Sequence, residues 1–320
     1  MKITSRRDVL TSVAAAAAGL PLLNDLAGNG ATASAATAPA TASTATGDRF
    51  PSNAALYSSG SFREGEHWMR RFRCTPRAEL LDNAAGTSNP VRSTAVIAPH
   101  GGGIEAGTSE LCLALAGYKP AGAGDTLPVP ESGVPQRDYW MFEALASSAE
   151  LHVTSTHCDD PAALAVCGNN LYAVSLHGFT PKDGQPAKQI LIGGRDQRLM
   201  RNLAWAFDRH GFTPSAPTPE LAVTVTVAGT DSSLNGDDPA NIVNRTRTAA
   251  GAQLEISTKL REAMFGSFGS AADRRRTAGV GDGNQAHFWN GFVGAVREAL
   301  DRHELGLDDL PEPAAYSGTP

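Results

Sequence analysis

The sequence is poor in cysteine and in long apolar runs, and each scarcity excludes a class of protein. Only 4 of the 320 residues are cysteines, and they do not form the Cys-x-x-Cys pairs that are typical of structural zinc sites. The longest apolar run, residues 13–23, is about half of the roughly 20 residues needed to span a bilayer. We therefore expect no zinc ribbon and no membrane span in the mature chain.

Positive charge is also scarce. The chain has 27 lysines and arginines against 33 aspartates and glutamates, which gives a formal net charge of −6 at pH 7. Nucleic acids and anionic membranes attract basic surfaces, so we expect neither as a partner. An anionic substrate would have to be bound by arginines placed locally in its site.

The first residues have the pattern of an export signal. Arg6 and Arg7 precede the apolar run, and an alanine- and threonine-rich tract follows it. Paired arginines before a short apolar segment are typical of twin-arginine signals, and the tract has too few large apolar side chains to pack. We expect residues 1–49 to be this signal and a disordered tract, and the mature protein to be secreted.

The remaining chain shows no linker and no internal repeat. This predicts a single domain over residues 50–306 and a C-terminal tail over residues 307–320. An exported protein meets oxidising conditions, so one or two disulfides could form. The available residues are Cys74, Cys112, Cys158 and Cys167, of which the last two are nearest in sequence.

Short apolar segments bounded by turn residues alternate with segments of helical periodicity. This predicts an α/β fold with a mixed, mostly parallel central sheet flanked by helices. The predicted strands are 94–98, 151–156, 172–176, 189–192, 221–227 and 252–256. The predicted helices are 108–115, 197–210, 258–265 and 285–302.

Three further segments have a predicted place. Valine and threonine alternate in residues 221–227, which is typical of a strand at a sheet edge. Residues 125–137 and 266–283 are expected to be surface loops, the second with an exposed Arg274–Arg276 run.

A histidine and a carboxylate flank three glycines directly after the predicted strand 94–98. The glycines allow a tight turn that could bring His100 and Glu105 around one point. His177 ends the strand 172–176, and open α/β sheets build their sites at such carboxyl ends. Two histidines and one carboxylate are the ligand set of many catalytic zinc ions. The alternative interpretation is a hydrogen-bonded core histidine beside an ordinary turn.

Glu255 lies inside an apolar strand. Leu254 and Ile256 should face one side of that strand, while Glu255 faces the other. Near a metal, such a carboxylate can act as a general base. The alternative is a structural glutamate that pairs with Arg245 or Arg261.

Five motifs in register resemble the phage-type poly-γ-glutamate hydrolases over most of residues 94–265. They are His100-Gly-Gly-Gly-Ile-Glu105-x-Gly-Thr-Ser-Glu110, Ser155-Thr156-x-x-Asp159-Asp160-Pro161, Leu176-His177-Gly178, Ile192-Gly193-Gly194-x-Asp196 and Gly251-x-Gln253-Leu254-Glu255-Ile256-Ser257-x-x-Leu260-Arg261. The resemblance implies a zinc-dependent amidohydrolase with a carboxypeptidase-like α/β core that cuts γ-glutamyl amide bonds. It implies His100, Glu105 and His177 as ligands of one zinc ion and Glu255 as the general base. The ligand types alone would also admit cobalt or manganese.

A γ-linked polyglutamate carries a free carboxylate on every unit, which calls for cationic groups in the site. The candidates are Arg261, which belongs to a matching motif, and Arg245 and Arg247, which only precede the Glu255 strand. The motifs give His157 no role, and we interpret it as an ordinary polar residue.

Two other functions remain open from the sequence. An exported protein of this fold could bind a polyanion or a cell-wall peptide without cleaving it. A γ-D-glutamyl peptidase of peptidoglycan, or a hydrolase of another N-acyl amide, would use the same metal chemistry in a different pocket.

Overall fold

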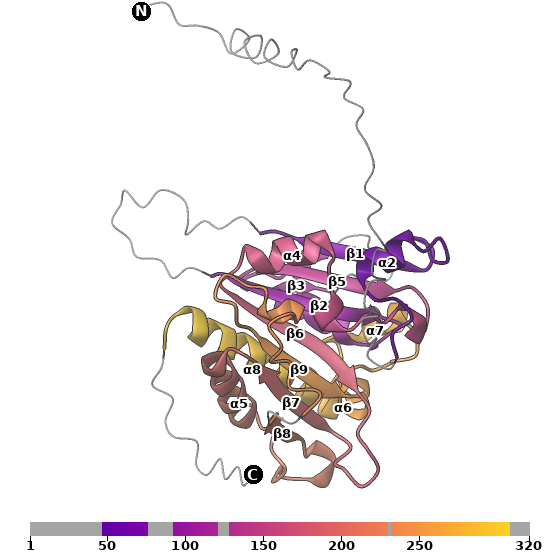
Figure 1. Ribbon diagram of the computed structural model, residues 1–320. Helices are drawn as coiled ribbons and strands as arrows, with labels where there is room; N and C mark the ends of the chain where they lie inside the picture. Colours follow the sequence, from indigo (N-terminus) through magenta and orange to yellow (C-terminus); the bar gives the residue numbers. More distant parts are fainter. Residues whose placement is uncertain (1–46, 76–91, 121–127, 230–231, 308–320) are drawn as a thin grey trace, which may run out of the picture. The chain divides into compact units, whose positions relative to one another are not determined.

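Seven short strands form one central sheet, and helices pack against both of its faces (Figure 1). The structure, a computed structural model, describes residues 47–75, 92–120, 128–229 and 232–307. The predicted export signal, the tract up to residue 46 and the tail from residue 308 lie outside the described residues. No described helix combines the length and the hydropathy that a membrane crossing requires.

The sheet is mixed and mostly parallel, as predicted. Its strand order is β1-β5-β2-β6-β9-β7-β8, and only the β1–β5 and β9–β7 pairings are antiparallel. The strands are β1 (Trp68–Arg73), β2 (Thr94–Gly102), β5 (Asp138–Ala144), β6 (Tyr172–Phe179), β7 (Gln189–Gly194), β8 (Thr224–Val227) and β9 (Ala252–Ser257). The alternating strand β8 lies at the edge of the sheet, which confirms its predicted place. The strands β3 (Tyr118–Lys119) and β4 (Val129–Pro130) form a separate pair.

The longer predicted helices are confirmed. The helices are α2 (Asn53–Ser58), α3 (Thr108–Leu115), α4 (Pro161–Gly168), α5 (Gln197–Arg209), α6 (Thr258–Ala263), α7 (Ala271–Thr277) and α8 (Gly283–Glu304). The Asp196 side chain caps α5 by accepting a hydrogen bond from the Leu199 N–H, which satisfies an otherwise unpaired donor of the first turn. Phe288, Phe292, Val296 and Leu300 of α8 are all buried.

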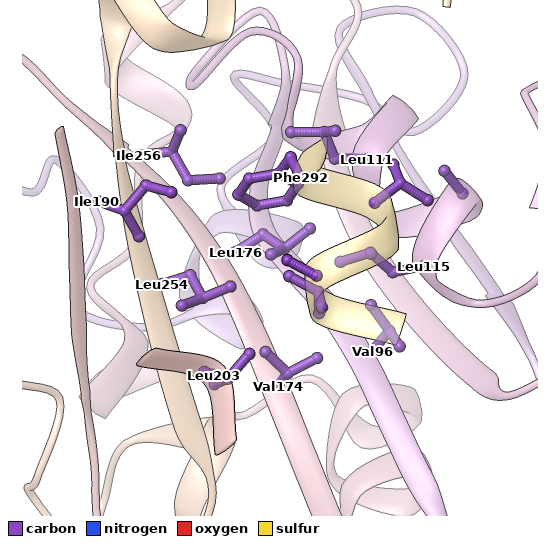
Figure 2. Close-up of a cluster of buried hydrophobic side chains, with 14 of the residues drawn as sticks. Val96, Leu111, Leu115, Val174, Leu176, Ile190, Leu203, Leu254, Ile256 and Phe292 are labelled. Carbon is purple, nitrogen blue, oxygen red and sulfur yellow. The ribbon is translucent and has the colours of Figure 1, made fainter. Parts of the chain in front are cut away.

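Each face of the sheet has its own apolar core. Val174 and Leu176 of β6 belong to the larger core, under α3, α5, α6 and α8, and Ala173 belongs to the smaller core, beside α4. Figure 2 shows the larger core, in which Phe292 of α8 lies against side chains from the strands. Because side chains alternate along a strand, Ser175 and His177 lie on the Ala173 face.

The predicted strand 151–156 is wrong. The chain there forms two 3₁₀ turns, η2 (Ala149–Leu151) and η3 (Ser155–His157). Leu151 and Val153 are both buried in the smaller core, so they alternate as strand residues would. The backbone of this segment, however, does not pair with another strand. It forms the two 3₁₀ turns, and the Thr154 N–H donates a hydrogen bond to the Asp48 carboxylate. Strands β1 and β5 and helix α4 were not predicted.

The segment 266–283 is not a simple exposed loop, because it contains α7. Arg274 is 4 % exposed; its Nε lies 3.4 Å from Glu110 Oε1, and its Nη2 donates to the Gly102 carbonyl. The expectation of an exposed Arg274 is therefore wrong, since a buried carboxylate on α3 partners it. All four cysteines lie in the described residues and none forms a disulfide.

Candidate metal centre

A bulge in β2 positions the first histidine. In the pairing of β2 with β5, Ala98 pairs with Met141 and the next pair is Gly101 with Glu143. Two residues of β2 thus lie opposite one residue of β5, so β2 contains one extra residue there. Such a bulge re-aims the neighbouring side chain. His100, within the bulge, is 3 % exposed, and its ring reaches the His177 ring on the neighbouring strand, with centroids 4.9 Å apart.

The glycines after His100 allow the chain to turn against β5. Gly102 has φ = 66°, and a Cβ there would lie 2.2 Å from the Ala144 carbonyl oxygen. No larger residue fits this position. The turn closes where the Glu105 N–H donates to the His100 carbonyl over 2.8 Å, which brings the Glu105 carboxylate back to the imidazole, as predicted.

The pairing of β6 with β9 places the other two groups. His177 and Glu255 are direct register partners on parallel strands, so their side chains leave the same face about 4.8 Å apart at the backbone. Both are buried. Glu255 Oε1 accepts a hydrogen bond from the Gln253 side chain over 2.9 Å, and Gln253 in turn accepts one from Asn241.

The Nδ1 atoms of two histidines and the two carboxylate oxygens of Glu105 converge on one point. His100 Nδ1 lies 2.9 Å from Glu105 Oε1 and 3.1 Å from His177 Nδ1, and His177 Nδ1 lies 3.7 Å from Glu105 Oε2. Ligands at zinc distances of about 2.0–2.1 Å in a tetrahedron are roughly 3.3 Å apart. The three side chains therefore have the spacing of a common metal ion.

The second nitrogen of each ring fixes its tautomer. His100 Nε2 lies 2.9 Å from the Val153 carbonyl oxygen, which can only accept, so Nε2 carries the hydrogen. His177 Nε2 lies 2.8 Å from Ser175 Oγ, a group that can accept in the same way. When both rings are neutral with the hydrogen on Nε2, each directs an Nδ1 lone pair toward the Glu105 carboxylate. These lone pairs repel one another unless a cation lies between them, so the donor set fits a divalent metal.

Burial and mutual charge shift the pKa values of these groups. Burial lowers the pKa of His177 to about 3, so its imidazole stays neutral and can donate a lone pair. Burial and the nearby Glu105 charge raise the pKa of Glu255 to about 8. Burial alone would raise the pKa of Glu105, but the two imidazoles hold it below its ordinary value. A basic carboxyl beside ionised Glu105 is the arrangement that a general base needs near neutral pH.

The cluster opens into a cavity of about 640 Å³. His100, Glu105, His177 and Glu255 all line it, together with residues 154–156 and 232–238. None of the described residues that line it is a lysine or an arginine. The cavity gives a substrate access to all four predicted groups.

A third histidine lies beside the group. His152 has a ring nitrogen within 4.8 Å of ligand atoms of His100 and Glu105, and its ring centroid is 4.0 Å from that of His100. We nevertheless assign the second histidine position to His177. Its Nδ1 lies 3.1 Å from His100 Nδ1 and 3.7 Å from Glu105 Oε2, and its side chain is 4 % exposed against 33 % for His152. The sequence does not single out His152, because residues 151–156 have the pattern of a strand and no motif includes this histidine.

The three predicted arginines are not in the cavity. Arg261 is buried, and its guanidinium donates to the Ile256 and Ala106 carbonyls, so it joins the glycine turn to β9. Arg245 and Arg247 are exposed, and the Arg247 N–H donates to the Asn170 carbonyl just before β6. The expectation of substrate contacts from Arg245 and Arg247 is not met, because neither lines the cavity and Arg247 lies beside the start of β6, whereas His177 and Glu255 lie toward the carboxyl ends of their strands. His157 does not line the cavity either.

The fold and the donor set define a class: an open α/β sheet with a two-histidine, one-carboxylate group at the strand ends is typical of metallohydrolases. A sequence model of the poly-γ-glutamate hydrolases matches residues 79–121 and 131–288, more than half of the chain. This chain belongs to the poly-γ-glutamate hydrolase family. The family resemblance inferred from the five motifs is thereby confirmed.

Two curated relatives are similar to part of this chain. The UPF0714 protein YndL of Bacillus subtilis strain 168 is 34 % identical over 184 residues, which are 57 % of this chain and 59 % of YndL. The prophage-derived UPF0714 protein YoqZ of the same organism is 32 % identical over 184 residues, 57 % of this chain and 55 % of YoqZ. The matched region thus spans less than two thirds of these curated relatives.

Two solved structures are similar over most of this chain. A bacteriophage poly-γ-glutamate hydrolase superposes with a TM-score of 0.57 and 27 % identity, covering 81 % of this chain and 99 % of that one. An apo, zinc-free YndL superposes with a TM-score of 0.54 and 26 % identity, covering 82 % of this chain and 100 % of that one.

Proposed function

We propose that this protein is an exported zinc-dependent hydrolase of γ-glutamyl amide bonds, such as those of poly-γ-glutamate. Family membership supports the hydrolase chemistry and the substrate class. The observation that carries the proposal is the convergence of His100 Nδ1, His177 Nδ1 and Glu105 within 3.7 Å of one another at a cavity. The solved structure of the relative YndL is described as zinc-free, which supports zinc as the ion.

His100, Glu105 and His177 would hold the zinc ion. When bound, zinc supplies Lewis acidity toward the substrate carbonyl and toward water. The hydrogen bonds from His100 to the Val153 carbonyl and from His177 to Ser175 keep each imidazole in the tautomer that offers Nδ1. Glu105 brings the negative charge that partly balances a divalent cation.

Glu255 would move the proton. Its Oε1 is held by Gln253, so Oε2 is the oxygen that takes a proton from the attacking water and delivers it to the nitrogen of the leaving amine. The raised pKa of Glu255, about 8, makes it a strong base in the metal-free site, and a nearby cation would lower that pKa. The attack and the departure of the amine then use the same carboxylate in turn.

Substrate carboxylates would be bound without an arginine clamp. The described cavity lining includes the hydroxyl-bearing residues 154–156, Ser232 and Ser233. These donors can hold a carboxylate as hydrogen-bond partners, and the cation at the centre would supply positive charge.

The pattern of Arg6 and Arg7 before the apolar run supports export by the twin-arginine route.

The decisive experiment combines metal analysis with product analysis. Purified protein is expected to contain about one zinc ion per chain and to shorten γ-linked but not α-linked glutamyl oligomers, and chelation should stop the reaction. Glu255→Gln should keep the zinc and lose about 10²–10⁴-fold of turnover. Glu262→Gln is the matched control, because Glu262 pairs with Lys259 on the surface of α6.

Two results would contradict the proposal. Full activity of the Glu255→Gln variant would remove Glu255 from the mechanism. Binding of γ-polyglutamate by wild-type protein without any shortening of the polymer would instead support a binding protein with a retained hydrolase fold.

A further inference from the structure

His152 has the position of a substrate-contacting residue, although no motif includes it. It lies between the turns η2 and η3 and lines the same cavity as Glu255. Its ring packs against the His100 ring, with centroids 4.0 Å apart. A 33 % exposed side chain next to an otherwise buried cluster faces whatever enters the cavity.

Asp48, more than 100 residues earlier in the chain, holds this histidine. Asp48 Oδ1 lies 2.6 Å from His152 Nδ1, and Oδ2 accepts a hydrogen bond from the Thr154 N–H over 2.7 Å. Burial alone would raise the pKa of Asp48, but these hydrogen bonds lower it, so the group is a carboxylate. Both of its oxygens are thus engaged with the segment that carries His152.

The contact determines which ring nitrogen is offered to the cavity. A carboxylate only accepts hydrogen bonds, so His152 Nδ1 carries the hydrogen. In the neutral ring, Nε2 then has a lone pair and can accept an N–H group. An amide substrate has one N–H group next to the scissile bond, on the nitrogen that Glu255 must protonate.

Residues 48–50, the N-terminal arm, are held in place by contacts of their own. Arg49 pairs with Glu150, and Phe50 is buried in the smaller core, where its ring packs edge-on against Phe62. Asp48 and Arg49 are at the end of segment 1–49, which the sequence predicts to be the signal and a disordered tract. These residues therefore anchor the segment that carries His152 and lines the cavity.

We propose that His152 accepts the N–H of the scissile amide through Nε2, and that Asp48 is the positioning residue that orients it. This inference rests on the proposed hydrolysis of γ-glutamyl amides and adds a residue to it. His152 is not a zinc ligand in this arrangement, so its loss leaves the metal in place. The N-terminal arm is then a part of the active site.

A double-mutant cycle tests the coupling of the two residues. His152→Ala and Asp48→Ala should each lower kcat/KM for a γ-linked glutamyl oligomer by about 10–100-fold, the range seen for groups that orient functional histidines. The double variant should be no worse than His152→Ala alone, because Asp48 acts through His152. Zinc content should stay at the wild-type level in all three. Arg49→Ala is the matched control on the same arm and should keep kcat/KM.

Two measurements do not depend on turnover. Ring ¹⁵N chemical shifts should show the Nδ1–H tautomer of His152 in wild-type protein and its loss in folded Asp48→Ala. In the Glu255→Gln background, which should bind but not cleave, His152→Ala should weaken binding of the oligomer about tenfold. If wild-type protein does not hydrolyse the oligomer but both measurements give these results, the proposed function fails and the His152 contact stands.

Several outcomes would overturn the inference. Loss of zinc from His152→Ala would make His152 a metal ligand. Additive losses in the double variant would show that Asp48 acts on the fold rather than on His152. Unchanged oligomer binding and turnover in folded His152→Ala would remove the substrate contact.

Discussion

The two ends of strand β2 carry two polar clusters of opposite character. At its start, the amino-edge cluster joins Arg92, Arg137, Thr94, Asp301 and Glu304. Arg137 donates to both Glu304 and Asp301, and Thr94 donates to Glu304 over 2.6 Å. Two cations thus face two carboxylates, and each charged group has a partner of opposite sign.

The carboxyl-edge cluster, at the other end of β2, is not balanced in this way. It consists of His100, Glu105, His177 and Glu255. In the described part of the chain, no lysine or arginine hydrogen-bonds to any of these four. The Arg261 guanidinium donates instead to backbone carbonyls and to Thr258. The comparison shows how a structural cluster differs from a functional one. A complete set of partners holds helix α8 on the sheet, whereas an excess of acceptors beside a cavity creates a place for a cation.

The largest expected effect concerns the carboxyl-edge cluster. His177→Ala should remove zinc and lower hydrolysis by roughly 10³-fold or more, because the cation's Lewis acidity contributes several kcal/mol to the transition state. Metal analysis and oligomer cleavage measure the two losses. His210→Ala is the control, since His210 pairs with Glu298 away from the site. A zinc-replete, active His177→Ala protein would break the assignment.

The amino-edge cluster should respond in the opposite way. Arg137→Ala leaves the buried Glu304 without its main partner and should lower the free energy of unfolding by about 3–5 kcal/mol. Zinc bound per folded chain should stay unchanged. Urea unfolding with a metal assay measures both quantities, and exposed Arg247→Ala serves as the control. Equal stability of Arg137→Ala and wild type would show that the cluster does not hold α8.

The pH dependence of stability should also separate the two clusters. The pKa of Glu255 is about 8 in the folded metal-free protein and near 4.5 when unfolded. The folded state therefore holds its proton more tightly, and its stability falls as the pH rises through this window. Glu255→Gln cannot ionise and does not lose stability in this way. The free energy of unfolding of Glu255→Gln minus that of metal-free wild type should therefore be roughly 2–4 kcal/mol larger at pH 9 than at pH 4. If the difference in unfolding free energy between the two proteins did not change with pH, the raised pKa of the buried Glu255 carboxyl would be contradicted.

The smallest effects come from two hydroxyls, one in each cluster. Thr94→Val removes a donor to Glu304, which keeps Arg137, and should cost about 1 kcal/mol of stability without altering zinc affinity. Ser175→Ala removes the acceptor that orients His177 and should weaken zinc binding by about tenfold with little change in stability. Zinc titration of both variants would sharpen the comparison. Equal zinc affinities would show that Ser175 does not orient the ligand.

Local patterns in the chain predicted much of the fold and four residues of the site. The apolar residues of α8 recur every four positions from Phe288 to Leu300. This spacing identifies the buried face of α8, because side chains four residues apart lie on the same face of a helix. The glycines after His100 permit the tight turn that brings Glu105 back, and alternation along β9 puts Glu255 on the polar face. These features depend on residues near one another in the chain, so the sequence alone contains them.

Only the tertiary structure decided which distant groups meet. The pairing of β6 with β9 makes His177 and Glu255 neighbours, and the buried Glu110 converts Arg274 from a surface residue into a core one. The same holds for Asp48 and His152, whose contact depends on the docking of the N-terminal arm. Strand order and long-range ion pairs depend on the packing of whole elements, and no local period records that packing.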